Sequence, residues 1–155
     1  MINSPDPTNL TDIRDLDLVA TVRSGRVLVG GAGVSGRGAI AMLKDIGCPE
    51  VVVVDDSALG ALVAADFSVR HIITADARDE LADAVAIVTS PGWRPDTPLL
   101  IDAMEAGIEV IGDVELCFRL DRAGVFGPPR TWLVVTGTNG KTTTTGMLAQ
   151  MMIVA

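Results

Sequence analysis

The chain has 155 residues, of which 48% are hydrophobic, 21% are charged and only 3% are aromatic. This composition excludes a disordered protein and predicts an aliphatic core, of the kind that a buried parallel sheet has. The 12 basic and 20 acidic residues give a net charge of −8, which argues against a nucleic-acid partner. No signal peptide or membrane-spanning run is evident, so we expect a cytoplasmic protein without membrane insertion.

Short apolar runs alternate with helical patterns along most of the chain. Residues 1–24 are predicted to be a loosely held polar arm, with at most a short helix near 12–19. Residues 25–122 are predicted to form an α/β domain with a Rossmann-like parallel sheet, because strands alternate with helices. The predicted strands are 27–29, 51–54, 84–89 and 109–111, and the predicted helices are 35–46, 59–66, 98–106 and 113–120.

The region after this domain has a different organisation. Residues 123–130 are rich in Gly and Pro and are predicted to be an interdomain linker. A strand at 132–135, a glycine-rich loop and a helix from Gly140 to about 152 are predicted to follow. One strand and one helix cannot bury their own apolar faces. Residues 131–155 are therefore interpreted as the start of a truncated P-loop ATP-binding domain.

The glycine-rich loop carries the strongest functional pattern. Its glycines allow several backbone N–H groups to point at one anion, and the following helix adds its positive end. Lys141 is placed to reach the β/γ-phosphates of ATP and is the candidate catalytic residue, whereas the Thr142 hydroxyl is the candidate Mg²⁺ ligand. Val135 stands where the longer form of this motif has Gly. The predicted ATP-binding residues are Gly137, Thr138, Asn139, Gly140, Lys141, Thr142 and Thr143.

A second glycine motif, Gly31-Ala32-Gly33-Val34-Ser35-Gly36, lies between the first predicted strand and the first predicted helix. Asp55 ends the next strand, which completes the pattern typical of dinucleotide binding. The pattern leaves open whether the ligand is NAD, FAD or a UDP-sugar. Ser90-Pro91-Gly92 follows a later strand, where such sheets bind ligands, although a plain turn is the simpler interpretation.

Other residues with chemical potential are interpreted as structural. Cys48 and Cys117 lack the spacing of metal ligands and are expected to be reduced thiols. His71 leads an apolar run and is expected to have a structural role rather than a catalytic one. Trp93 and Trp132 are expected to pack in the protein rather than to stack on a base.

Three segments, in this order, resemble the Mur ligases. They are the glycine turn with Asp55 on the next strand, then Ser-Pro-Gly, then Gly-Thr-Asn-Gly-Lys-Thr-Thr, and the resemblance covers residues 26–152. The glycine turn, Ser-Pro-Gly and the segment 112–116, Gly-Asp-Val-Glu-Leu, together favour the members that join D-glutamate to UDP-N-acetylmuramoyl-L-alanine. The resemblance implies a ligase of peptidoglycan precursor synthesis that uses ATP and Mg²⁺ and forms an amide through an acyl phosphate.

The resemblance also implies roles for individual residues. The first domain would hold the UDP end of the substrate, and Ser57 stands where some relatives carry an Arg that could aid this binding. The family's D-glutamate site and further Mg²⁺ ligands match nothing before residue 155, so we expect an N-terminal fragment that is inactive alone. The substrate-binding residues implied are Gly33, Val34, Ser35, Gly36, Asp55, Asp56, Ser90 and Gly92.

Three alternatives remain. Another Mur-family ligase, with a different amino acid as substrate, would share the same motifs. An NAD-dependent oxidoreductase would explain the first glycine turn but not the Lys141 loop. A non-catalytic nucleotide-binding module would use both glycine motifs for binding alone.

Overall fold

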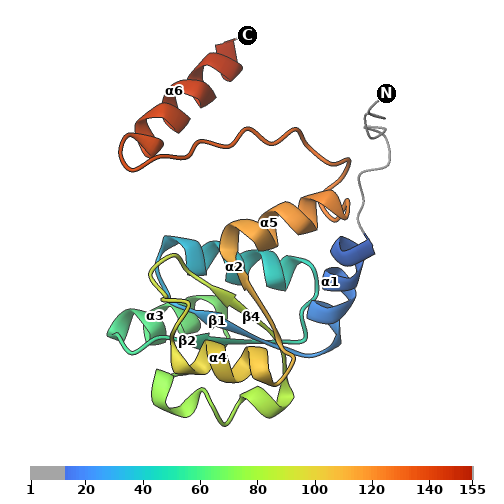
Figure 1. Cartoon of the computed structure of the whole chain (residues 1–155), viewed down its shortest axis with the longest axis vertical. Coiled ribbons are helices and arrows are strands. Elements are labelled where there is room, and N and C mark those ends of the chain that lie inside the picture. The colour runs from blue at the N-terminus through green and yellow to red at the C-terminus, as the bar shows by residue number, and fades with distance from the viewer. Residues whose placement is uncertain (1–12, 155) are drawn as a thin grey trace.

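The computed structural model describes residues 13–154. Its centre is one sheet of five parallel strands in the order β3-β2-β1-β4-β5, with helices on both faces (Figure 1). The strands are β1 (Arg26–Gly30), β2 (Glu50–Val54), β3 (Arg70–Ile72), β4 (Ala84–Thr89) and β5 (Glu109–Gly112). The helices are α1 (Ile13–Ser24), α2 (Val34–Asp45), α3 (Ala58–Phe67), α4 (Pro98–Glu105), α5 (Asp113–Arg122) and α6 (Lys141–Val154), with short 3₁₀ turns η1 (Thr74–Asp76) and η2 (Leu81–Asp83).

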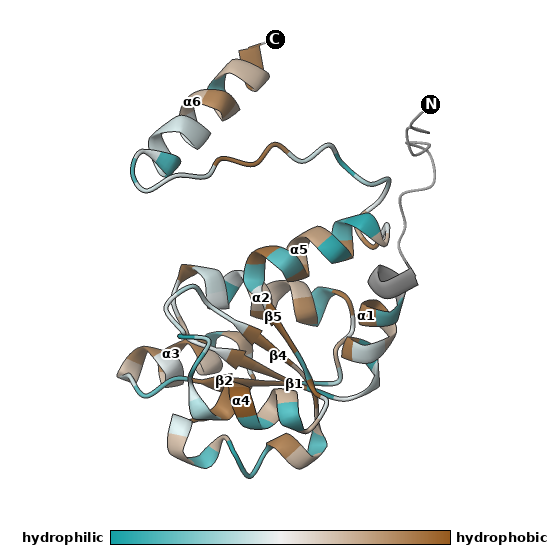
Figure 2. Ribbon diagram, viewed as in Figure 1, coloured by the Kyte–Doolittle hydropathy of each residue, from teal (hydrophilic) through white to brown (hydrophobic). Residues whose placement is uncertain are grey.

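The strands are apolar on both faces, as a sheet covered on both sides requires. Side chains alternate between the faces, so Val27 and Val29 belong to one core and Leu28 to the other. The first core contains buried side chains of α1, α2, α3 and α5, whereas the second is covered by α4. Figure 2 shows the hydrophobic strands enclosed between these helices.

The predicted α/β class and the alternation of elements are confirmed. Each strand and helix predicted between residues 27 and 120 is present, with bounds shifted by one or two residues. The sequence analysis missed β3, an edge strand whose first residues, Arg70 and His71, interrupt the apolar pattern. Edge strands are often polar, since a charged side chain there discourages pairing with another chain.

The short helix predicted near residues 12–19 is present but longer, since α1 spans Ile13–Ser24, and the prediction of a loosely held arm is wrong for these residues. Leu18 and Val22 are fully buried in the first core, and Val19 is 8% exposed. Leu18 and Val22 are four residues apart and therefore lie on the same face of the helix. This face can be buried although most of the other residues of α1 are polar. The Arg23 side chain also donates to the backbone carbonyl of Ile46 at 2.7 Å. Residues 1–12 of the predicted arm lie outside the described residues.

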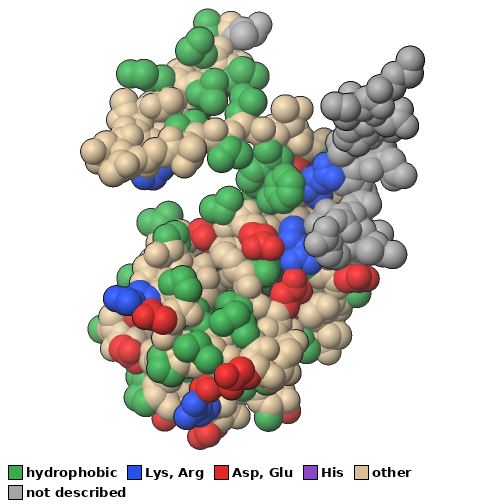
Figure 3. All heavy atoms as spheres, viewed as in Figure 1, with side chains coloured by type: hydrophobic (Ala, Val, Ile, Leu, Met, Phe, Trp, Pro, Cys, Tyr) green, Lys and Arg blue, Asp and Glu red, His purple; other side chains and the backbone are tan. Residues whose placement is uncertain are grey.

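The predicted strand at 132–135 is also absent from the structure. These residues are in no helix or strand, since the described residues offer no neighbouring strand with which they could form hydrogen bonds. The predicted helix after the loop is confirmed as α6, which stands apart from the sheet domain and has no buried residue (Figure 1). Figure 3 shows the hydrophobic side chains that α6 and the segment before it expose. They include Leu133, Val134, Met147, Met151, Met152, Ile153 and Val154.

Candidate nucleotide-binding site

The carboxyl ends of the five parallel strands form one edge of the sheet, called here the carboxyl edge. The loop after β1 leads to α2 on one face, whereas the loop after β4 leads to α4 on the other. Because β1 and β4 are neighbours, the two loops leave the sheet in opposite directions and open a crevice between them. Open α/β sheets bind their ligands at this point.

The glycine turn after β1 requires glycine at two positions. Gly31 has a φ of +92°, which glycine adopts without strain, and its N–H donates to the carbonyl of Val54 at 2.9 Å. A Cβ at Gly36 would lie 1.9 Å from the carbonyl oxygen of Gly31. The first turn of α2 can therefore pack against the end of β1 only with glycine at position 36.

The N-terminus of α2 faces solvent beside this turn. Gly33 precedes the helix without a side-chain cap, and Val34 is 92% exposed. The first N–H groups of a helix have no partner within it, and together with the helix dipole they attract an anion. The start of α2 therefore has backbone N–H groups without a partner in the helix, at the place where the motif predicts a phosphate group.

Asp55 holds the glycine turn in place. Its Oδ2 accepts the backbone N–H of Ala32 at 2.7 Å, and its Oδ1 accepts the N–H of Ser57 at 2.8 Å. Burial alone would raise the pKa of this carboxyl group, but the hydrogen bonds from Ser57 and Ala32 outweigh burial and lower the pKa below its ordinary value. The carboxylate therefore stays charged, with its oxygens already engaged by the protein.

The neighbouring residues of β2 and β3 form a second set of contacts at the carboxyl edge. Asp56 accepts the N–H of Thr74 at 2.7 Å, which ties the end of β2 to η1. The Nε2 atom of His71 lies 2.7 Å from the carbonyl oxygen of Asp55, close to Gly60 at the start of α3. The His71 ring thus links β3 to Asp55, whose carboxylate holds the glycine turn.

The Ser-Pro-Gly segment is tied to the glycine turn from the other side of the crevice. The Ser90 hydroxyl donates to the carbonyl of Gly30 at 2.6 Å, and the Ser90 N–H donates to the same oxygen at 3.0 Å. A Cβ at Gly30 would lie 2.8 Å from the ring of Trp93, so the indole covers the last residue of β1. Gly92 is exposed, with open space around its Cα.

Two hollows lie beside this assembly. One, of about 280 Å³, is lined by Thr74, Gly92, Trp93, Arg94 and Thr97. The other, of about 240 Å³, lies between α2 and α5 and is lined by Val34, Ser35, Gly38, Met42, Asp113, Val114, Cys117 and Trp132. The sequence analysis did not single out Thr74, Arg94 or Thr97, because no motif marks them and only the fold brings them to the crevice.

The second glycine loop leads directly into α6. Gly137 and Gly140 have φ values of +148° and +78°, and Lys141 begins α6. The Lys141 ammonium donates to the carbonyl of Gly137 at 2.7 Å, so its side chain folds back over the loop. The loop thus brings the N-terminus of α6 and one cation close together. Thr142 follows Lys141 in the first turn of the helix.

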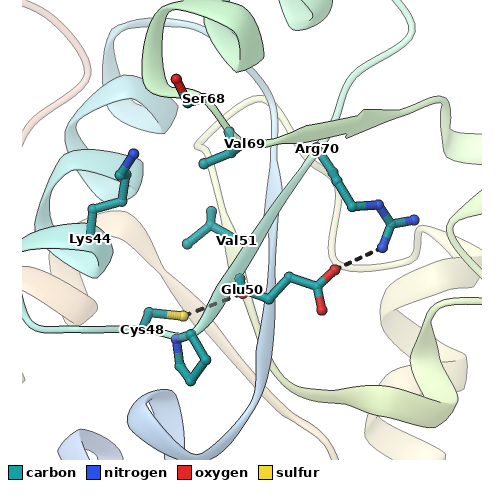
Figure 4. Close-up of a pocket in the computed structure, with 8 residues that line it drawn as sticks. Lys44, Cys48, Glu50, Val51, Ser68, Val69 and Arg70 are labelled. Carbon is teal, nitrogen blue, oxygen red and sulfur yellow. Dashed lines mark hydrogen bonds and ion pairs between the residues drawn. The ribbon is translucent and has the colours of Figure 1, made fainter.

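A further hollow, of about 260 Å³, lies at the opposite edge of the sheet (Figure 4). It is next to a charge network in which Arg26 pairs with Glu50 at 2.9 Å and with Glu80 at 2.6 Å. Arg70 pairs with the same two carboxylates at 2.8 and 2.7 Å. These ion pairs join β1, β2 and β3 at their amino ends, far from the glycine turn along the strands.

Within residues 13–154, no group of three or more His, Cys, Asp or Glu side chains could hold a metal ion. None of the described helices is long and apolar enough to cross a membrane.

The parallel sheet with helices on both faces is a fold of the Rossmann type. A solved structure, the glutamyl-tRNA reductase of Methanopyrus kandleri, matches with a TM-score of 0.50 and 19% identity. The match covers 66% of this chain and 34% of that one, and it shows the fold alone.

The sequence comparisons are more specific. The family profile described as "Mur ligase MurD-like, N-terminal domain" matches residues 25–112, and the chain belongs to this family. The UDP-N-acetylmuramoylalanine–D-glutamate ligase of Corynebacterium diphtheriae is 54% identical over 141 residues, which is 90% of this chain and 30% of that protein. The ligase of the same name from Mycolicibacterium smegmatis is 47% identical over 138 residues, covering 88% of this chain and 28% of that protein. The chain thus spans less than a third of these relatives.

Proposed function

We propose that this chain binds the UDP end of UDP-N-acetylmuramoyl-L-alanine at the carboxyl edge of its sheet. The activity to which it would contribute is the ATP-dependent addition of D-glutamate to that substrate, a cytoplasmic step of peptidoglycan precursor synthesis. The observation that carries the proposal is the solvent-facing N-terminus of α2, which the glycine turn and Asp55 hold at the switch point of the sheet. The names of relatives that are about half identical supply the substrate.

The proposed contacts follow from this geometry. The N–H groups of residues 34–36 would donate to the diphosphate, with the Ser35 hydroxyl beside them. Asp56, Ser90 and Gly92 border the crevice on its two sides and would lie along the uridine and the sugar. Asp55, whose oxygens already accept protein N–H groups, would act mainly by holding the turn in its binding conformation.

The second glycine loop is proposed to hold the phosphates of ATP. Gly137, Thr138, Asn139, Gly140 and Thr143 would supply backbone donors, and Lys141 would neutralise charge. The Thr142 hydroxyl would contribute one ligand to a Mg²⁺ ion that also binds the phosphates. When bound, ATP supplies the phosphoryl group that turns a carboxylate into an acyl donor. The positive φ values of Gly137 and Gly140, the folded-back Lys141 and the start of α6 support this assignment.

Val34 offers a sharp test of the diphosphate site, because its side chain is exposed and occupies the first position of α2. An Asp there suits the helix dipole, so Val34→Asp should leave the thermal midpoint unchanged or slightly higher. The added charge should repel a diphosphate and weaken binding of UDP-N-acetylmuramoyl-L-alanine at least tenfold, as measured by isothermal titration calorimetry. The neutral variant Val34→Asn is the matched control and should keep most of the affinity.

Comparing ligands separates this proposal from its rivals. UDP alone should compete with the full substrate, and NADH should not bind. NADH binding without UDP binding would instead support the nicotinamide-dependent oxidoreductase, which the comparisons do not favour. Equal affinity in the Asp and Asn variants would contradict a diphosphate at the start of α2.

A further inference from the structure

The hydrogen-bond ladder between β2 and β3 is interrupted at its carboxyl end. The two strands pair in parallel up to Val54 and Ile72, and the N–H of Asp55 still donates to the carbonyl of Ile72 at 3.1 Å. In a regular parallel ladder, the Asp55 carbonyl would then accept the N–H of Thr74. That N–H instead donates to the Asp56 carboxylate at 2.7 Å. The Asp55 carbonyl must therefore bind a different donor.

The imidazole of His71 supplies this donor. Its Nε2 atom lies 2.7 Å from the Asp55 carbonyl oxygen. Since a carbonyl oxygen only accepts hydrogen bonds, the hydrogen of the neutral ring is on Nε2. The half-buried side chain of His71 thus replaces a backbone N–H of the strand to which it belongs.

Gly60, in the first turn of α3, leaves room for the His71 ring. A Cβ at this position would lie 2.6 Å from the Nε2 atom of His71 and 2.8 Å from the Cβ of Asp55. The start of α3 therefore packs directly on the imidazole, and a larger residue at position 60 would displace it. The position of the ring is fixed by this packing as well as by its hydrogen bond.

The hydrogen bond from His71 also fixes the direction of the next N–H group. A trans peptide is planar and holds its C=O and N–H on opposite sides. The Asp56 N–H therefore points away from β3, because the Asp55 carbonyl points toward it. On that side the neighbour of β2 is β1, but the chain leaves the sheet there at Gly31, whose φ is +92°. The Asp56 N–H thus faces the glycine turn instead of a strand.

This N–H group is available to a ligand. Asp56 is exposed, and within the described part of the chain its N–H donates to no protein acceptor. The carboxylates of Asp55 and Asp56 belong to the same turn and repel an anion. The acceptor that this donor suits is therefore an uncharged oxygen, such as a hydroxyl or carbonyl oxygen of a nucleoside, rather than a phosphate.

We propose that His71 is a positioning residue of the nucleotide site, which holds the peptide between Asp55 and Asp56 so that the Asp56 N–H donates to an uncharged oxygen of the nucleoside. This role rests on the proposed function, because it requires UDP to lie at the carboxyl edge. His71 itself does not touch the ligand. All the contacts lie within residues 25–112, which the family profile matches, so none of them depends on the chain after this domain.

A pair of amide variants tests the role of His71, with UDP binding to the 155-residue chain measured by isothermal titration calorimetry. Gln carries its N–H donor about as far from the backbone as the Nε2 atom of His, whereas the donor of Asn is one methylene group nearer. His71→Gln should keep the UDP affinity within about twofold, and His71→Asn should weaken it about five- to tenfold, the effect of one lost hydrogen bond. Equal affinities in the two variants would overturn the proposal.

Gly60→Ala tests the same hydrogen bond from the side of α3. The added methyl group displaces the imidazole, so UDP affinity should fall as in His71→Asn, although Ala suits a helix better than Gly. Ala61→Ser changes the exposed neighbouring position and should leave the affinity unaltered. All variants are compared at a temperature where circular dichroism shows them folded. An unchanged affinity in Gly60→Ala would also overturn the proposal.

Comparing UDP with CDP identifies the oxygen that accepts the Asp56 N–H. CDP has the same ribose but carries an amino group in place of the 4-carbonyl oxygen of uracil. If His71→Asn weakens the binding of UDP alone, the acceptor is that carbonyl oxygen. If it weakens the binding of both nucleotides equally, the acceptor is an oxygen that they share. Either result supports the proposal.

Spectra of the ligand-free chain distinguish the role of His71 from the proposed function. The sequence has one His, so the ¹H–¹⁵N signals of its ring are unambiguous. The neutral ring should carry its hydrogen on Nε2, and the amide signal of Asp56 should shift further in His71→Asn than in His71→Gln. UDP binding with the hydrogen on Nδ1 would refute the positioning role alone. The expected ring signals without any UDP binding would instead refute the proposed function.

Discussion

The carboxylate of Asp55 accepts the backbone N–H of Ala32 at 2.7 Å, which joins the end of β2 to the glycine turn that follows β1. The acidic residue of a dinucleotide-binding pattern usually faces a ribose. Here its oxygens are engaged within the protein, by Ala32 and by Ser57. The shape of the turn therefore depends on a side chain from the neighbouring strand, and this dependence can be measured.

Replacing Asp55 by Ala should destabilise the domain. Two backbone N–H groups would lose a charged acceptor, and each such bond contributes about 1.5–3 kcal/mol. We expect urea denaturation to show a loss of at least about 1.5 kcal/mol, together with weaker UDP binding. Asp66→Ala is the control, because Asp66 is an exposed partner of Arg37 and such pairs contribute at most about 1 kcal/mol. Equal losses in both variants would show that Asp55 does not hold the turn.

Two glycines of α2 should respond in opposite directions to the same substitution. A Cβ at Gly36 would meet the Gly31 carbonyl oxygen at 1.9 Å, so Gly36→Ala must displace the turn and should cost about 3 kcal/mol or more. A Cβ at Gly38 meets nothing within 4 Å, and Ala suits a helix interior better by about 0.5–1 kcal/mol. Thermal unfolding should therefore show a lower midpoint for Gly36→Ala and a slightly higher one for Gly38→Ala.

The N-terminal helix should contribute to the stability of the sheet domain. Leu18 is fully buried in the first core, and truncating such a residue to Ala costs about 2–5 kcal/mol. Leu18→Ala should lower the urea midpoint accordingly, with a single transition. Asp17→Ala, at the exposed neighbouring position, should change stability by less than about 0.5 kcal/mol. A negligible effect of Leu18→Ala would mean that α1 does not pack as described.

Stability should depend on pH in the acidic range. The backbone N–H of Arg130 and the indole of Trp132 lower the pKa of Asp121 below its ordinary value of 3.8. The unfolded chain thus binds a proton at a higher pH than the folded chain does, so this stabilisation is full above about pH 5 and is lost as pH falls through 4 and below. Urea denaturation between pH 3 and 7 should show this decline. Asp121→Asn should be less stable at pH 7 and should show a shallower decline.

The regular part of the fold follows directly from local sequence patterns. The apolar runs of β1 and β2, residues 27–29 and 51–54, are short and are followed by Gly or Asp. The short length and these flanking residues distinguish buried parallel strands from helices. The full length of α1 and its packing could not be predicted in the same way, because one apolar stripe of Leu18, Val19 and Val22 is weak evidence until a sheet exists for it to cover. Its helical state depends on tertiary packing, which local patterns do not contain.

The candidate site was predictable where a motif constrains the backbone. Gly31 and Gly36 are needed for the conformation of the turn itself, so their positions could be recognised from spacing. Other contacts depend on the directions in which side chains point. The indole of Trp93 covers Gly30. The side chains of Arg130 and Trp132 both donate hydrogen bonds to Asp121. No spacing rule describes those directions, so these contacts could not be predicted from the sequence.

The charge network of Arg26, Glu50, Arg70 and Glu80 lies at the amino ends of the strands, and the glycine turn lies at the other ends. This separation has an evolutionary consequence. A lineage that moves to a warmer or saltier habitat can alter the ion pairs without touching a residue of the crevice. Ion pairs that tune stability and the residues of the proposed ligand site are thus placed on different parts of one small domain, where natural selection can act on each of them independently.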